Sequence, residues 1–136
     1  MQATLIIVFA LLGTSIGSFL NVVIYRLPRR KPFWRFGQRS YCPNCKTTLE
    51  PKDLVPILSF VILRGKCRHC KKHISWQYII VESVTALAFA VCAGVFGLSL
   101  ELLYALVLIS FAIPLCVIDA RHKVIPDALS IPFIVV

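Results

Sequence analysis

The sequence predicts an all-α, polytopic membrane protein that carries a small zinc-binding loop domain on its cytoplasmic side. Hydrophobic residues make up 58% of the 136-residue chain, above the roughly 45–50% that is usual for soluble domains. The excess is gathered into long runs, and most of the positive charge lies in one loop between them. That loop contains two Cys-x-x-Cys pairs, which is the ligand spacing of structural zinc sites.

The first apolar run, Ala3 to Tyr25, contains no charged residue. About 20 apolar residues in a helix cross a hydrocarbon core of about 30 Å, so this run predicts a first transmembrane helix within residues 1–27. A cleaved signal peptide is the alternative. Signal peptides carry basic residues before their apolar stretch, whereas here they follow it, which favours a retained helix.

Two further runs predict a second and a third transmembrane helix. They are Tyr78 to Phe96, whose one charge is Glu82, and the uncharged Leu102 to Ile118. Residues 128–136 begin a fourth run, which rises only about 14 Å as a helix. Either this last helix is re-entrant or the polypeptide is truncated inside it, and we favour truncation. We therefore expect three complete helices and the start of a fourth. The second helix, the third helix and this start lie within residues 77–136.

The positive charges predict how these helices are oriented. All but two of the 15 Lys and Arg residues lie between Arg26 and Lys72, and the other two, Arg121 and Lys123, follow the third run. Short loops rich in Lys and Arg stay in the cytoplasm. The sequence therefore predicts an external N-terminus and a cytoplasmic loop at residues 28–76.

The loop holds its four cysteines, Cys42, Cys45, Cys67 and Cys70, as two closely spaced pairs. Four thiolates form a tetrahedral structural zinc site that leaves no open position for catalysis. Disulfides are disfavoured in a reducing cytoplasm, and a thioredoxin-like redox pair would need a βαβ context that is absent here. A loop of this size buries little core, so bound zinc would supply much of its folding energy.

The basic charge of the loop and one apolar stretch within it indicate what the loop contacts. The topology requires its basic charge, which also attracts anionic lipid, so membrane lipid is an expected partner and nucleic acid is not. Residues 53–63 are apolar but too short to span a bilayer. We expect them either to lie against the membrane surface or to pack on the helices.

Polar residues at membrane depth are costly and are therefore candidates for function. Asn21 and Arg26 end the first run, and Glu82 lies about one turn inside the second. Arg26 is either an interfacial anchor or a site residue. Glu82 is either a structural partner of Asn21 or Arg26, or a residue that contacts substrate. The small residues between Gly13 and Ser18 predict close helix packing.

Asp119 directly follows the third run, at the expected cytoplasmic boundary. From its position alone it is either an interfacial charge paired with Arg121 or Lys123, or a functional carboxylate. Asp127 begins the next apolar run, where an N-cap is the ordinary role of Asp. Eight residues of helix would separate the two carboxyl groups by about 12 Å, and Pro126 interrupts such a helix, so nothing favours a catalytic pair.

Several ordered motifs run along the whole chain. They are Gly17 to Pro28, Ser40 to Cys45, Leu54 to Ser59, Arg64 to Cys70, Ile74 to Tyr78 with Val81-Glu82, and Ile118-Asp119 with Ile125 to Asp127. Together they resemble the N-terminal portion of the type IV prepilin peptidases. These prepilin leader peptidase/N-methyltransferases are polytopic GxGD-type aspartyl proteases of the bacterial inner membrane.

The resemblance implies cleavage of the basic leader of prepilins and pseudopilins at the cytoplasmic membrane face, with Asp119 as the first catalytic aspartate. It also implies N-methylation of the new N-terminus by S-adenosylmethionine, with Glu82 and the loop as candidate residues. Asp127, Arg26 and Asn21 are possible supporting residues. The family's second aspartate lies in a downstream Gly-x-Gly-Asp motif that this sequence lacks, so whether the 136 residues cleave anything alone is left open.

Two other functions stay open at this point. One is a noncatalytic membrane zinc module that binds prepilins or assembly partners, and the other is a remnant that only methylates prepilins. The sequence specifies neither the pilin substrate nor the oligomeric state.

Overall fold

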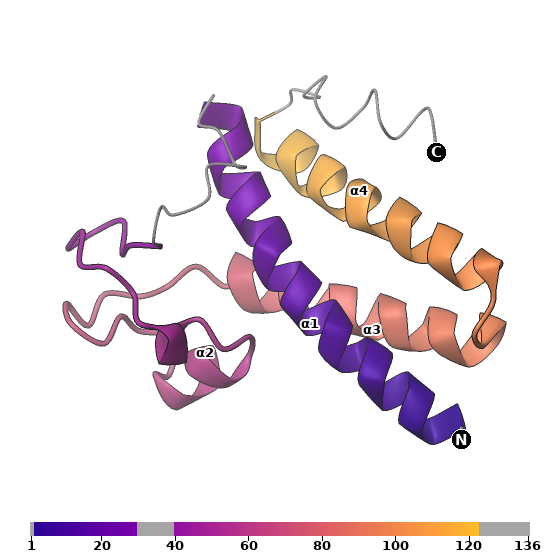
Figure 1. The fold of residues 1–136 in the computed structure, drawn as a ribbon. Coiled ribbons are helices and arrows are strands. Elements are labelled where there is room, and N and C mark those ends of the chain that lie inside the picture. Colours follow the sequence, from indigo (N-terminus) through magenta and orange to yellow (C-terminus); the bar gives the residue numbers. More distant parts are fainter. Residues whose placement is uncertain (1, 30–39, 123–136) are drawn as a thin grey trace.

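The computed structural model describes residues 2–29 and 40–122 as a helical protein (Figure 1). Its elements are α1 (Gln2–Arg26), the 3₁₀ helices η1 (Leu27–Arg29) and η2 (Pro51–Asp53), α2 (Leu58–Ile62), α3 (Gln77–Phe96) and α4 (Leu100–His122). Extended pairing in these residues is limited to two isolated β-bridges. The all-α class predicted from the sequence is confirmed.

The helices α1, α3 and α4 are long and apolar enough to cross a bilayer. Their outer faces expose large apolar side chains, among them Leu11, Leu87 and Leu103, which lipid tails accommodate and water does not. The chain is therefore a membrane protein with the three predicted spans. The third helix is longer than predicted, because α4 continues past Ile118 to His122. The fourth run predicted for residues 128–136 lies outside the described residues.

The helices α1 and α3 approach each other closely at two glycines one helical turn apart. A Cβ atom added to Gly13 would lie 2.7 Å from the Cα atom of Ala86, and one added to Gly17 would lie 2.8 Å from the Cα atom of Glu82. Both distances are too short for real carbon atoms, so the backbones meet only because these positions lack side chains. The close packing predicted from the small residues is confirmed.

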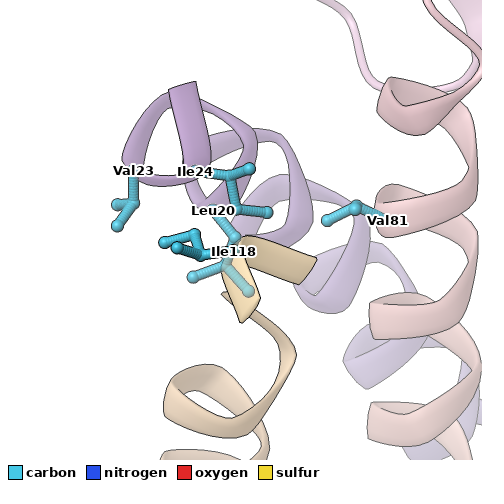
Figure 2. Close-up of a cluster of buried hydrophobic side chains, with 5 residues drawn as sticks. All are labelled: Leu20, Val23, Ile24, Val81 and Ile118. Atoms are coloured by element: carbon cyan, nitrogen blue, oxygen red, sulfur yellow. The ribbon is translucent and has the colours of Figure 1, made fainter. Parts of the chain in front are cut away.

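Two clusters of buried side chains join the helices. At the loop end of the bundle, Leu20, Val23 and Ile24 of α1 pack with Val81 of α3 and Ile118 of α4 (Figure 2). The second cluster joins α3 to α4 and consists of Phe89, Ala93, Leu102 and Leu106. Because α3 runs opposite to α1 and α4, the C-terminal ends of α1 and α4 lie beside the start of α3, next to the loop (Figure 1).

Candidate functional site

The first Cys-x-x-Cys pair lies in a tight turn, or knuckle, that backbone hydrogen bonds close. The amide of Lys46 donates to the carbonyl of Cys42 (2.9 Å), and the amide of Cys42 donates to the carbonyl of Thr47 (3.0 Å). Tyr41 and Thr48 flank the turn as an antiparallel β-bridge. Lys46 has a φ of 57°, in the left-handed region that such a turn requires.

The second pair repeats this geometry position by position. The amide of Lys71 donates to the carbonyl of Cys67 (3.0 Å), and the amide of Cys67 donates to the carbonyl of Lys72 (2.9 Å). Lys66 and His73 form the matching β-bridge, and Lys71 again has a positive φ of 59°. The loop therefore contains two copies of one knuckle, and each copy supplies two sulfur atoms.

The four sulfur atoms gather at one point. All four Sγ atoms lie within 4.8 Å of one another, with Cys42 to Cys70 at 3.9 Å and Cys45 to Cys67 at 4.0 Å. A tetrahedron with Zn–S bonds of about 2.3 Å has sulfur–sulfur edges of about 3.8 Å. The same separations are about twice the length of a disulfide bond, and the cysteines are free thiols. This cluster can hold one metal ion, and its size fits zinc.

Two of these thiols differ in acidity because their surroundings differ. The backbone N–H of Lys72 and the side chain of Asn44 lower the pKa of the Cys70 thiol to about 6. Burial raises the pKa of the Cys42 thiol to about 11. Metals bind the thiolate form of cysteine. At neutral pH Cys70 is therefore mostly a thiolate. Cys42 keeps its proton until a bound cation displaces it.

Polar contacts tie the knuckles to the rest of the loop. Asp53 of η2 accepts from Arg68, with the Nη2 atom at 2.7 Å and the Nε atom at 2.8 Å from the same oxygen. The Asp53 side chain is only 2% exposed. Burial alone would raise its pKa, but the hydrogen bonds from Arg68 and from the Glu50 amide hold the pKa below its usual value. Lys72 donates to Asn44 across the two knuckles (2.9 Å).

Glu82, a predicted site residue, attaches the loop to the membrane helices. Its buried carboxylate in α3 accepts the backbone N–H of Ile57 at 2.7 Å. Ile57 has φ 60° and ψ −52°, and its neighbours Pro56 and Leu58 are joined by a backbone hydrogen bond. This is a γ-turn of the strained, positive-φ kind, which a β-branched residue rarely adopts. The structure thus tolerates strain in the loop where the loop meets Glu82.

Asn21 and Arg26 border a cavity of about 1340 Å³ that lies between the loop and the helices α1 and α3. Asn21 is 1% exposed, and its Nδ2 atom donates to the carbonyl of Tyr78 at 3.1 Å. Its Oδ1 atom is buried and has no hydrogen-bond partner among the described residues. Glu82 also lines this cavity, so the structure brings together three of the polar residues that the sequence singled out.

Asp119 is exposed in the last turn of α4, directly after the fully buried Ile118. Arg121, two residues further on, borders the cavity between the loop and the helices. Asp119 therefore lies at the same end of the bundle as the cysteine cluster. Asp127, the other aspartate singled out from the sequence, lies outside the described residues.

With this geometry in view, residues 11–96 match the family model of the bacterial peptidase A24 N-terminal domain. The chain belongs to this family. The matched stretch contains both knuckles of the A24 N-terminal domain, together with Asn21, Arg26 and Glu82. Asp119 lies beyond it. No solved structure matches the chain.

Curated relatives extend the similarity beyond residue 96. The chain is 43% identical over 121 residues to the prepilin leader peptidase/N-methyltransferase of Myxococcus xanthus, covering 89% of this chain and 36% of that protein. It is 41% identical to the Bacillus subtilis protein of the same name (90% and 48% covered) and 37% identical to that of Vibrio cholerae (97% and 54% covered). The chain thus spans about half or less of the length of these relatives. The match to the Vibrio cholerae protein covers 97% of this chain, so it includes position 119.

Two features of this A24 N-terminal domain were missed from the sequence. The pairing of Asp53 with Arg68 carried no local signal, because 15 residues separate the partners. The bond from Ile57 to Glu82 involves a backbone amide, which no side-chain pattern reveals.

Proposed function

We propose that this chain forms the N-terminal part of a membrane aspartyl endopeptidase that removes the basic leader of type IV prepilins and pseudopilins. The family and its relatives support the substrate class. The observation that carries the site is the location of Asp119 in the last turn of α4, directly after Ile118, which packs at the loop end of the bundle. With the basic loop in the cytoplasm of a bacterium and the N-terminus outside, that end faces the cytosol at the inner membrane.

In this proposal Asp119 is one of two catalytic carboxylates. One acid removes a proton from water, while its protonated partner polarises the scissile carbonyl. The other four acids among the described residues do not offer this partner. Glu50, Asp53 and Glu82 are bonded to Lys52, Arg68 and Ile57, and Glu101 lies in the first turn of α4, at its opposite end. Pro126 interrupts a helix between Asp119 and Asp127, so the partner acid is proposed to come from the additional length that the relatives possess.

Ile118, the buried residue before Asp119, holds the backbone of Asp119 in place. Ile118 packs between α1 and α3 with no exposed surface (Figure 2). This contact fixes the last turns of α4 and leaves the next side chain exposed at the end of the bundle. A fixed backbone beneath an exposed carboxylate is what a catalytic acid at a membrane boundary requires.

Zinc is proposed as the structural metal of the loop, bound by Cys42, Cys45, Cys67 and Cys70. The chain would then consist of a first helix (1–27), a cytoplasmic four-cysteine domain (28–76) and the remaining helices (77–136). Four thiolates fill the coordination shell of zinc, so the ion would hold the loop together and take no part in cleavage.

The cavity between the loop and the helices is the proposed site of S-adenosylmethionine for N-methylation of the cleaved pilin. Its volume of about 1340 Å³ exceeds the roughly 300–1,000 Å³ of ordinary ligand pockets. Asn21 and Glu82 line this cavity, and the Glu82 carboxylate provides an acceptor for the ammonium or hydroxyl groups of such a ligand. The bound cofactor would supply the methyl group, and these side chains would hold it.

A reconstituted assay tests the peptidase. The chain is joined to the remaining length of its Bacillus subtilis relative and incubated in liposomes with a prepilin, with and without S-adenosylmethionine. We expect cleavage, and a loss of at least about 10²-fold in Asp119→Asn, which is the usual scale of a lost general acid or base. Glu101→Gln, a carboxylate change at the opposite end of α4, is the matched control and keeps full activity.

Each outcome of this assay favours one function. Cleavage by Asp119→Asn at the unsubstituted rate would refute the peptidase role of this residue. Methyl transfer without cleavage would favour the methyltransferase-only remnant. Prepilin binding without either reaction would favour the noncatalytic zinc module.

A further inference from the structure

The loop exposes an unusual number of large apolar side chains over a short stretch. We call residues 54–63, which contain α2, the apolar segment. Five of its side chains are at least 40% exposed: Leu54, Val55, Leu58, Val61 and Ile62. Ile62 is 73% exposed. Contiguous apolar surface of this kind marks a site that another surface covers.

Two contacts fix how deep this segment lies relative to the membrane helices. The amide of Ile57 donates to Glu82, five positions beyond the first residue of α3 at Gln77. At 1.5 Å per residue, this point is about 7.5 Å along α3 from its start. Phe60 contacts Trp76, with ring centroids 5.3 Å apart. Trp is the residue type that favours the membrane–water interface.

The charge around the segment complements the headgroups of a membrane. Arg64 and Lys66 lie two and four residues after the end of α2, and both are exposed. Basic residues next to an apolar surface bind anionic lipid, while apolar side chains enter the boundary between headgroups and acyl chains to about 5–10 Å. The depth estimated along α3 falls inside this range.

We propose that the apolar segment is a lipid-binding anchor, which lies in the cytoplasmic bilayer interface and holds the zinc domain against the membrane. Its five-residue helix rises only about 7.5 Å, so it rests in one leaflet. Ile80 and Val84, two positions on either side of Glu82 in α3, are also exposed. The basic flank and the attachment of the segment to a membrane-spanning helix favour lipid over a second protein as the occupant. The proposal stands on the membrane helices and is independent of any enzymatic activity.

Fluorescence quenching tests the anchor in the intact chain. Trp34 and Trp76 are replaced by Phe, and a single Trp is introduced by Ile62→Trp or, as the matched control, by His69→Trp in the second knuckle. Both proteins are placed in phosphatidylcholine–phosphatidylglycerol vesicles, with ordinary or dibrominated acyl chains. Zinc content is measured in each to verify that the domain is intact.

We expect the Trp at position 62 to emit at shorter wavelength, to be quenched by brominated lipid and to be protected from aqueous acrylamide. The Trp at position 69 should show the opposite behaviour. Acrylamide quenching at position 62 equal to that at position 69 would overturn the proposal. So would protection from both quenchers, because that result would indicate that protein covers the segment.

Discussion

The membrane bundle and the zinc loop are held together by different forces. In the bundle, helices that satisfy their own backbone hydrogen bonds pack through Gly13 and Gly17 and through buried apolar clusters. Among the residues described in the loop, the buried hydrophobic side chains are those of Cys42 and Cys67. Order in the loop comes from turn hydrogen bonds, one partly buried ion pair and the sulfur cluster. The difference teaches that the bundle should fold without metal and that the loop should not.

The largest effect is expected from removing a sulfur. Cys67→Ser should reduce bound zinc from about one per chain to nearly none, because structural zinc contributes on the order of 10–16 kcal/mol to such small domains. Metal analysis of the purified protein measures this. Cys92→Ser, which changes a cysteine of α3 outside the cluster, should keep the zinc. Full metal content in Cys67→Ser would argue against the four-sulfur site.

In the bundle, the corresponding test adds one carbon at the closest helix contact. Gly17→Ala should lower the free energy of unfolding by about 1–3 kcal/mol, since the new Cβ atom overlaps the α3 backbone. Denaturation in detergent, followed by circular dichroism, measures the change. At Gly94 an added Cβ atom meets only Ile6, at 3.5 Å. Gly94→Ala should therefore be neutral or stabilise by up to about 1 kcal/mol. Equal effects at both positions would contradict the close α1–α3 contact.

A third prediction concerns the joint between the two regions. Glu82→Ala removes the acceptor of the Ile57 amide and should cost about 1–3 kcal/mol of docking free energy. Hydrogen exchange at that amide should become faster. Glu82→Gln keeps an acceptor oxygen at the same place and should change exchange much less. Unchanged protection at Ile57 in Glu82→Ala would show that other contacts dock the loop.

The smallest effect is expected at the ion pair inside the loop. Asp53→Asn should destabilise the loop by about 1 kcal/mol at pH 7, a modest value because Arg68 is 39% exposed. The pKa of Asp53 is lowered in the folded loop, so its contribution is present above the unfolded pKa of about 4 and is lost as the pH falls through the lower folded pKa. Stability curves of the two proteins should converge below about pH 4. A difference that grows on acidification would contradict this assignment.

Much of the bundle could be predicted from the sequence, because apolar runs of helical length have few alternatives in a membrane. The limits of α1 and α3 fall within one residue of the runs from Ala3 to Tyr25 and from Tyr78 to Phe96. The end of α4 was missed because the apolar run stops at Ile118, whereas the helix continues through Asp119 and Arg121. Charged residues at a membrane boundary continue a helix without extending its apolar pattern.

The site was only partly predictable. The four cysteines were found because metal ligands obey strict spacing, and they do converge. The contact between Glu82 and the loop was not predicted, because the partner of Glu82 is the backbone amide of Ile57 in a strained turn. Such contacts between distant segments depend on the whole fold and leave no trace in local composition.

Hydrogen exchange along the whole chain, measured in lipid nanodiscs before and after zinc is chelated, compares the two regions directly. After chelation, the amides of the knuckles, such as those of Cys42, Cys67 and Lys71, should lose their protection, while the amides of α1, α3 and α4 keep theirs. Protection that persists in the knuckles without metal, or that disappears from loop and helices together, would contradict the separation of a metal-dependent loop from a self-sufficient bundle.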